Sequence, residues 1–596
     1  MKLHAPVDDW VFILTRLLRV QNRTDLPGFA DITEDVVADL LHEAARFTED
    51  VLVDVCAAGD REGARFEDGT VHAPTGFREA LRRTADAGWH SIGIPAELGG
   101  GGMPSVLAAA VAQMRGPVTH SFGMYSSFCS SAALMLSRAG EPWMQEVVIP
   151  RLVAADWTAT MCMTEAHCGS DLRRLRTRAV QDADGTWRIT GDKIFISGGE
   201  HDLTDNIVHV VLAKVPGPDG TVSDTLEDVN VFLVSKHLLD PATGELGERN
   251  DVAALGIEHK MGIEGSATCQ MRFDGAVGWR LSVPGARGAT ANMAPMFVMM
   301  NTARVGVALN GVGYAHLAAA NALDYARDRL SGRAPAGPAR PDLPADPIAV
   351  HPDVRRLLLG ASSFAQGARA LCAQVALWQA ASQVAAGPEA ADLRGLAELF
   401  RPVLKAYCTD KGFESAVNAQ QVLGGHGYTT DFPIEQWVRN ARIGQIYEGA
   451  NGIQARDFVR RCVQGRDAHA LEGFFGLAEE LIARHQGHDE VARHAEAFRG
   501  ALARLRKAVA AVQAADAGAG AAAAYDLMTA FGVLGVAWAW LRTLEVLDEG
   551  GVAEAMVREK RRLANVWIKR ELPLVAAYAD RVEDLAGELL EEDPFA

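Results

Sequence analysis

A change of hydrophobic period along the 596-residue chain constrains the fold more than any other feature. From residue 36 to about 156, apolar side chains recur at helical spacing, as at Leu40, Ala44 and Phe47. From about 157 to 285, short β-branched runs follow one another, bounded by Gly, Pro and Asp, without helical stretches between them. This pattern predicts a mainly α-helical protein with a central antiparallel β sheet or barrel.

The segments after this β region predict where the remaining domains begin and end. Helical spacing returns and continues towards the C-terminus, interrupted by a proline-rich loop at 335–347. Two long helices are expected at about 352–385 and 394–423, the second ending at Gly424. The expected domains are an N-terminal extension at 1–35, an N-terminal helical domain at 36–156, a middle β domain at 157–285, a C-terminal helical domain at 286–465 and an additional helical domain at 466–596.

Composition excludes several classes of function. The formal net charge of −18 argues against a nucleic-acid partner, since phosphates require a basic surface. The apolar run Met528–Leu541 is too short to span a membrane and predicts a buried core helix. No secretory signal is recognisable, so a cytoplasmic protein is expected. The eight cysteines form no CxxC pair, and Cys162, His167 and Cys168 are interpreted as packing residues, so no metal site is expected.

Glycine runs are the first candidates for cofactor binding. The run at 424–427 follows a predicted helix, whereas a Rossmann fingerprint follows a strand. The run at 99–102 lacks the Lys-Ser or Lys-Thr of a phosphate-binding loop. Neither a nicotinamide fold nor such a loop is therefore predicted. A glycine-capped helix end can still admit a diphosphate, because backbone N–H groups approach closely where side chains are missing.

Three segments taken together resemble the signatures of the acyl-CoA dehydrogenase family. They are MCMTEAHCGSD at 161–171 with KIFIS at 193–197, QVLGGHGY at 421–428, and QIYEGANGIQ at 445–454. The resemblance covers roughly residues 36–465, and the helical, β, helical order agrees with the family's fold. The long C-terminal extension is similar to that of the subgroup that includes dehydrogenases for ordinary acyl-CoAs and for methylthiopropanoyl-CoA. The resemblance implies a role in fatty acid metabolism.

The resemblance also implies ligand-binding roles for individual residues. Alone, each would be interpreted as a turn, strand-core or surface residue, and only their joint order favours function. The positions implied for FAD are Thr164, Gly169, Ser170, Phe195, Ser197, Arg329, Gln421, Gly424, Gly425 and Asn451. The positions implied for the acyl-CoA substrate are Ser170, Arg304, Tyr447 and Gly449. Arg329 matches an arginine that reaches FAD across a subunit interface, which implies a homodimer or a dimer of dimers.

Glu448 matches the family's catalytic base. The α-C–H of a thioester is a weak acid, so a positioned carboxylate must take the proton while a hydride leaves the β-carbon for the flavin. The product would be the trans-2-enoyl thioester. The other base position known in the family is occupied here by Ala303, which leaves Glu448 as the candidate. Asn451 and Gly452 are expected to cap the helix that follows.

Some residues depart from the family pattern, and several functions stay open. Ala166 replaces a proline, Ala450 replaces a threonine that would help to orient the flavin, and Phe195 replaces a frequent tryptophan. An electron-transfer flavoprotein is the implied electron acceptor. The alternatives are an acyl-CoA oxidase using O2, a flavin-binding homologue without turnover, and a dehydrogenase of carrier-protein thioesters. The additional helical domain is expected to supply no catalytic group.

Overall fold

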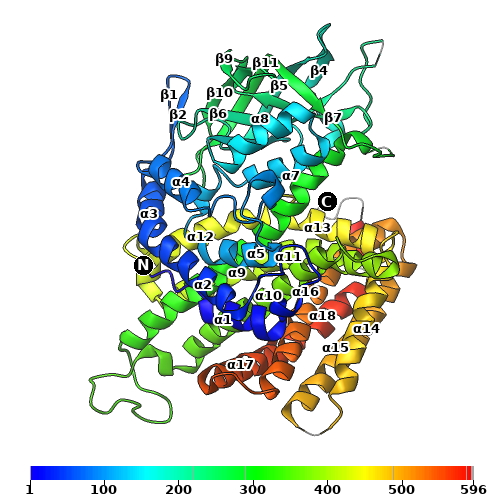
Figure 1. The fold of residues 1–596 in the computed structure, drawn as a ribbon. Coiled ribbons are helices and arrows are strands. Elements are labelled where there is room, and N and C mark those ends of the chain that lie inside the picture. Colours follow the sequence, from blue (N-terminus) through cyan, green and yellow to red (C-terminus); the bar gives the residue numbers. More distant parts are fainter. Residues whose placement is uncertain (1, 218, 289, 488, 585–586, 592–596) are drawn as a thin grey trace. The chain divides into compact units, whose positions relative to one another are not determined.

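The computed structural model describes residues 2–217, 219–288, 290–487, 489–584 and 587–591. Within it the chain forms two compact units (Figure 1). Unit 1 contains residues 1–45, 104–117 and 304–596, and unit 2 contains residues 46–103 and 118–303. The contacts thus group the N-terminal extension, residues 36–45 and residues 104–117 with the C-terminal helices, while residues 46–103 belong to unit 2.

Unit 2 is built on a seven-stranded sheet, as the β-branched runs predicted. Five strands close on themselves, because β11 pairs with β5, β5 with β4, β4 with β6, β6 with β7, and β7 with β11. The strands of the sheet are β3 (Trp157–Cys162), β4 (Arg178–Gln181), β5 (Trp187–Ser197), β6 (Asn206–Lys214), β7 (Val229–Ser235), β10 (Val252–Ile257) and β11 (Thr268–Leu281).

The strand pairing is mixed rather than wholly antiparallel. β6 pairs in parallel with β3 and, at one register position, with β4, while the other pairs of this sheet are antiparallel. Parallel pairing needs a long connection between the two strands, and other strands of the sheet lie between β3 or β4 and β6 in the sequence. β4 itself is followed by a short hairpin to its antiparallel partner β5. Two short hairpins lie outside the sheet: β1 (Arg65–Glu67) with β2 (Thr70–His72), and β8 (His237–Leu239) with β9 (Leu246–Arg249).

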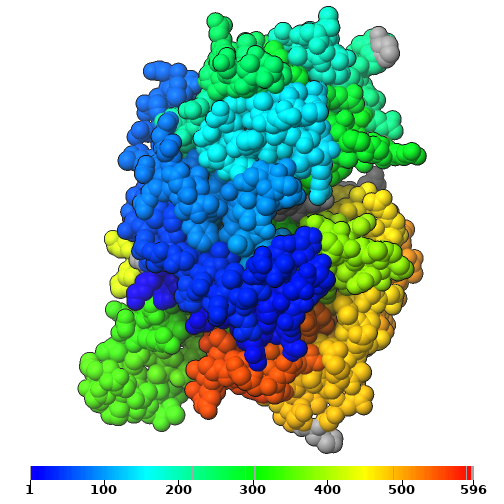
Figure 2. Space-filling view, in the orientation of Figure 1, coloured from blue at the N-terminus to red at the C-terminus, as the bar shows by residue number. Residues whose placement is uncertain are grey.

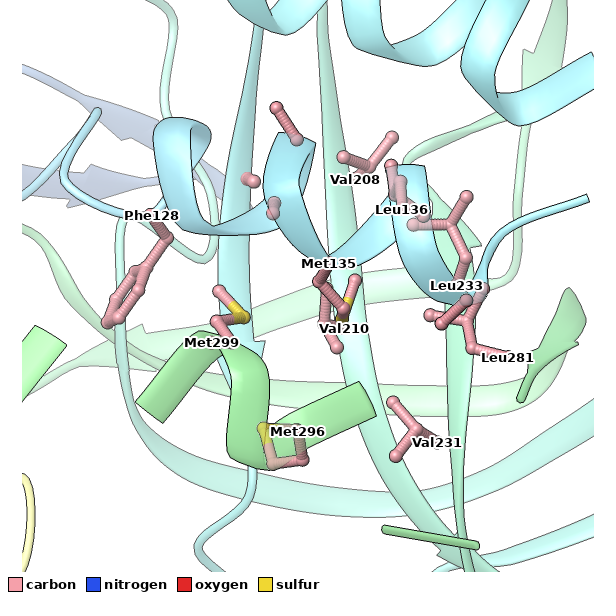
Figure 3. Packing of buried hydrophobic residues seen from close by; sticks show 14 of the residues in the cluster. Phe128, Met135, Leu136, Val208, Val210, Val231, Leu233, Leu281, Met296 and Met299 are labelled. Carbon is pink, nitrogen blue, oxygen red and sulfur yellow. The ribbon is translucent and has the colours of Figure 1, made fainter. Parts of the chain in front are cut away.

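Alternation along β6 and β7 divides the apolar side chains of unit 2 between two cores. Val208 and Val210 of β6 lie in one core with Met135 of α7 and Met296 of α9 (Figure 3). Their neighbour Val211 lies in the other core, with the residues that pack around Phe77 and Tyr125. Since both faces of these strands are covered, each is buried along its whole length.

The helices of unit 2 are short, and α9 links it to unit 1. Its helices are α3 (Val53–Glu62), α4 (Phe77–Asp86), α6 (His120–Gly123), α7 (Cys129–Ala139) and α8 (Pro142–Val153). α2 (Glu34–Phe47) and α9 (Ala294–Asp328) run from one unit into the other.

Unit 1 is helical in its described part. The two long helices expected after the proline-rich loop are present as α10 and α11, the latter beginning earlier than predicted. Its helices are α1 (Val7–Val11), α5 (Ser105–Arg115), α10 (Pro352–Ala381), α11 (Gly387–Val422), α12 (Ile434–Arg442), α13 (Asn451–Phe458), α14 (His469–Arg484), α15 (Glu490–Ala514), α16 (Ala517–Asp548), α17 (Glu554–Val566) and α18 (Leu574–Asp584).

The core of unit 1 forms around α16. On the surface, the N-terminal residues lie against the C-terminal helices (Figure 2). Among the described residues, α16 alone is long and apolar enough to cross a membrane, yet 89% of its apolar window is buried inside the protein. Its central residues are the run Met528–Leu541, which was predicted to form a core helix, and that prediction is confirmed.

Candidate active site

Glu448 lies on a strained turn of unit 1, between a 3-10 turn at Ile443–Gln445 and the start of α13. Its backbone has φ +55°, and the next residue, Gly449, has φ +85°. A left-handed conformation is uncommon for a residue other than glycine and is concentrated at functional sites. Gly449 is required twice, since a Cβ there would also lie 2.4 Å from Nε2 of Gln454.

The Glu448 carboxyl group is chemically poised to accept a proton. Its Oε2 atom is buried and has no hydrogen-bond partner among the described residues. Burial raises the pKa of Glu448 to about 7, although the nearby cations of Arg304 and Lys405 oppose the rise. Arg304, on α9, is itself half-buried, and no residue that the structure describes accepts a hydrogen bond from its Nε. A base with a pKa near neutrality suits proton transfer at physiological pH.

Lys405 of α11 supports this turn and was not predicted. Its side chain is fully buried, and its Nζ donates hydrogen bonds to the Gly449 carbonyl at 2.7 Å and to Asn451 Oδ1 at 2.9 Å. Burial lowers the pKa of Lys405 to about 8, while the anions of Glu448 and Asp410 act in the opposite direction. The sequence signal that could have found it is a lone lysine among the apolar residues of a long helix.

The structure corrects the expectation that Asn451 caps the helix. The Asn451 side chain instead forms hydrogen bonds with residues of α11. The cap position of α13 is Ala450, without a side-chain hydrogen bond, and Asn451 is the first helical residue. The Asn451 amide group donates to Thr409 Oγ1 at 3.0 Å and to Asp410 Oδ1 at 2.8 Å. Asn451 is 5% exposed, so the structure favours a role in holding the turn over direct contact with FAD.

The residues on either side of Glu448 complete the turn. Tyr447 is half-buried, its hydroxyl group shares a hydrogen bond with Asn310 of α9, and burial raises its pKa. No described residue accepts a hydrogen bond from the backbone N–H of Glu448 or of Gly449. These amides are therefore available to a carbonyl oxygen on which negative charge develops.

In unit 2, the two matched segments 161–171 and 193–197 are joined by a buried ion pair. Lys193 Nζ lies 2.9 Å from Glu165 Oε1, and both side chains are buried. Glu165, His167 and Cys168 could by spacing hold a metal ion. However, the Glu165 oxygens already accept hydrogen bonds from Lys193, the Arg176 amide and Thr177. We therefore interpret Glu165 as the residue that fixes the turn at 164–170.

Phe195 projects from a β-bulge close to this turn. Ile194 and Phe195 together oppose the single residue Gln270 on β11, and Phe195 has φ +59°. Its ring is 58% exposed, which is unusual for a large apolar side chain next to a sheet core. Ile194 donates its amide to the Thr164 carbonyl at 2.9 Å, so Phe195 and Thr164 lie on adjoining segments.

The other positions implied for the cofactor are open to solvent within their units. Ser197 at the end of β5 is half-buried, while Gly169 and Ser170 are exposed. In unit 1, α11 ends before Gly424, which has φ +56°, as the predicted helix end requires. A Cβ at Gly424 or Gly425 would meet no atom within 4 Å. The side chains of Gln421 and Arg329 are likewise exposed.

Comparisons with known proteins identify the family of the chain. The acyl-CoA dehydrogenase N-terminal, middle and C-terminal domain families match residues 37–156, 160–276 and 294–463. A further family, described as acetyl-CoA dehydrogenase C-terminal like, matches residues 474–593. The chain therefore belongs to the acyl-CoA dehydrogenase family.

Two relatives match nearly the full length of the chain. It is 33% identical to the 3-methylmercaptopropionyl-CoA dehydrogenase of Ruegeria pomeroyi over 99% of both chains. It is 31% identical to the broad-specificity linear acyl-CoA dehydrogenase FadE5 of Mycobacterium tuberculosis, again over 99% of both. The crystal structure of Caenorhabditis elegans ACDH-11 in complex with C11-CoA has the same fold, with a TM-score of 0.80 at 19% identity, covering 100% of this chain and 96% of that one.

FAD is the cofactor of this family, and the residues fit it in each unit taken by itself. In unit 2, the exposed Phe195 ring offers a flat apolar surface beside the Thr164 turn. In unit 1, the open backbone at Gly424 and Gly425 lets N–H groups approach an anion. These are the properties that an isoalloxazine ring and a diphosphate require.

Proposed function

We propose that the protein is an FAD-dependent acyl-CoA dehydrogenase that converts an acyl-CoA into the trans-2-enoyl thioester, with Glu448 as the base. One observation carries the proposal. Glu448 offers a buried, unpartnered carboxylate oxygen whose pKa is raised to about 7, next to unpartnered backbone amides. Burying this carboxylate is costly, because no described residue donates a hydrogen bond to its Oε2 atom.

The chain's own residues would act on the thioester in the following way. The Glu448 and Gly449 amides would bind the carbonyl oxygen and stabilise the charge that develops there. Glu448 Oε2 would take the α-proton, while Tyr447 and Lys405 hold the turn in place. FAD, when bound, supplies the acceptor for the β-hydride. Binding of the acyl chain would exclude water from the site and make the Glu448 carboxylate a stronger base.

We expect the purified protein to be yellow with non-covalent FAD and to lose its colour when a good acyl-CoA is added without oxygen. A panel of acyl-CoAs of different chain lengths, followed by flavin absorbance, identifies the substrate class. Admitting air then separates a dehydrogenase, whose flavin stays reduced, from an oxidase, whose flavin recovers at once. A protein that takes up no FAD, or a flavin that no acyl-CoA reduces, would contradict the proposal.

A dimeric FAD site is the second part of the proposal. Arg329 is exposed at the end of α9, and no described residue forms an ion pair with it. Arg329→Ala should lose most of its FAD, while the dimer or dimer of dimers persists. Arg327→Ala is the matched control, because Arg327 is an exposed arginine two residues earlier, at the end of α9, and pairs with Asp324. A monomer with full FAD content would refute this part.

Other features of the enzyme extend the proposal. We propose that the protein lies in the cytoplasm and has the five-part domain division given by the sequence pattern.

We propose an electron-transfer flavoprotein as the electron acceptor. An assay with an electron-transfer flavoprotein and a dye checks the acceptor. Comparing a CoA thioester with the same acyl group on a carrier protein decides between these two substrate classes.

A further inference from the structure

The C-terminal extension reaches the Glu448 turn through a chain of hydrogen bonds. Tyr525, on α16 of the extension, donates its hydroxyl hydrogen to Asp410 Oδ2. Asp410, on α11, accepts through its other oxygen from Asn451 at 2.8 Å and from Gln445 at 2.7 Å. Asn451 in turn accepts from Lys405, which also binds the Gly449 carbonyl.

Asp410 therefore closes the two ends of the loop that carries the base. Gln445 precedes the loop and Asn451 follows it, and both side chains meet at one oxygen of a single carboxylate. Glu448 and Gly449, which lie between Gln445 and Asn451 in the sequence, both adopt left-handed backbone conformations. Such conformations persist only where surrounding contacts hold them. Tyr525 is the donor that occupies the second oxygen of Asp410, and its hydroxyl group also lies within hydrogen-bonding reach of Asn451.

We propose that Tyr525 is a positioning residue for the catalytic base, so that the C-terminal extension orders the active-site turn through Asp410 and Asn451. This inference rests on the proposed function, because it takes Glu448 as the base. It adds a positioning role to the additional helical domain, which was expected to supply no catalytic group. In this proposal the extension acts by holding the residues that shape the turn.

The surroundings of Tyr525 explain why its hydroxyl group matters. Tyr525, Asp410 and Gln445 line a cavity of about 480 Å³ between α11, α16 and α18. Tyr578 of α18 lines the same cavity, but its hydroxyl group makes no hydrogen bond to any described residue. Without the Tyr525 hydroxyl group, Asp410 Oδ2 would face the cavity and accept a hydrogen bond from water instead of from a fixed side chain. Asp410 would then hold Gln445 and Asn451 less firmly, although no apolar contact is lost.

The test compares Tyr525→Phe with Tyr578→Phe, since each removes one phenol hydroxyl from the same cavity. Tyr525→Phe should reduce the limiting rate of flavin reduction by on the order of tenfold, as expected for a lost hydrogen bond to a charged group. The half-saturating acyl-CoA concentration and the FAD content should stay within about twofold of the parent. Tyr578→Phe should reduce flavin at the parent rate.

A second measurement does not depend on turnover. Hydrogen exchange of the segment 445–454 should be faster in Tyr525→Phe than in the parent, and unchanged in Tyr578→Phe. Asp410→Asn combined with Tyr525→Phe should be little slower than Asp410→Asn alone, because both changes break the same chain. Parent-like reduction and parent-like exchange in Tyr525→Phe would overturn the inference. If no acyl-CoA reduces even the parent protein, the proposed function fails, and the exchange result alone decides whether Tyr525 orders the turn.

Discussion

Glu448→Gln is expected to lower the rate of flavin reduction by at least about 10²–10⁴-fold, the range typical of losing a positioned base. Glutamine keeps the size of the side chain and removes only its basicity, so FAD and acyl-CoA should still bind. Glu448→Asp should recover part of the rate, because the shorter side chain stops short of the α-proton. Stopped-flow absorbance of the flavin under anaerobic conditions measures all three proteins.

The pH dependence gives an independent check of this assignment. The pKa of Glu448 is raised to about 7 by burial, so the parent rate should increase as pH rises through that value. The rise should vanish in Glu448→Gln, which has no proton to lose. Glu545→Gln, which removes a carboxylate paired with Arg484 on the extension, should behave as the parent. Glu448→Gln with parental reduction kinetics would show that another group takes the proton.

Asp9→Asn is expected to lower the free energy of unfolding by about 3–5 kcal/mol, since it leaves two buried cations without their anion. Asp9 forms ion pairs with Arg369 of α10 and with Lys560 of α17. Both cations are buried, and Lys560 also lies 4.6 Å from the centre of the Phe12 ring. Asp8→Asn is the matched control, because Asp8 is exposed and should change stability by less than about 0.5 kcal/mol.

Lowering the pH should reduce the free energy of unfolding of the parent protein for the same reason. Burial alone would raise the pKa of Asp9, but Lys560 and Arg369 outweigh it and hold the pKa below the usual value of 3.8. The stabilisation by Asp9 is therefore present above about pH 4 and lost as pH falls through its lowered pKa. Urea denaturation at pH 7 and at lower pH measures this contribution. Equal urea midpoints for Asp9→Asn and Asp8→Asn at pH 7 would contradict the role of the buried cluster.

The sequence predicted those parts of the fold that depend on local pattern. Helical spacing located α10 and α11, and the β-branched runs at 207–215 and 229–234 became β6 and β7. The sequence did not predict which of these strands pair with one another. The closed ring of strands and the parallel pairing of β3 with β6 join residues far apart in sequence, and no period of two or 3.6 residues records which strand lies beside which.

The same distinction applies to the active site. Glu448, Tyr447 and Gly449 were identified because one short motif contains them. Residues adjacent in sequence on one turn are also adjacent in space. Lys405 and Tyr525 were missed because each stands alone in a long helix, and only the packing of α11 and α16 against the turn gives it a role. Asn451 was found by its motif, but its partners on α11 determined its use.

By itself, the sequence thus determined the kinds of elements, their order and the family, and it supplied Glu448 as the proposed base. The tertiary structure decided which distant side chains hold the turn of Glu448, how deeply its carboxyl group is buried, and which residues join the two ends of the chain. Ion pairs such as Asp9 with Lys560 depend on contacts across more than five hundred residues. Such contacts follow from the burial of whole helix faces, and a local motif contains no information about the partner that each face will meet.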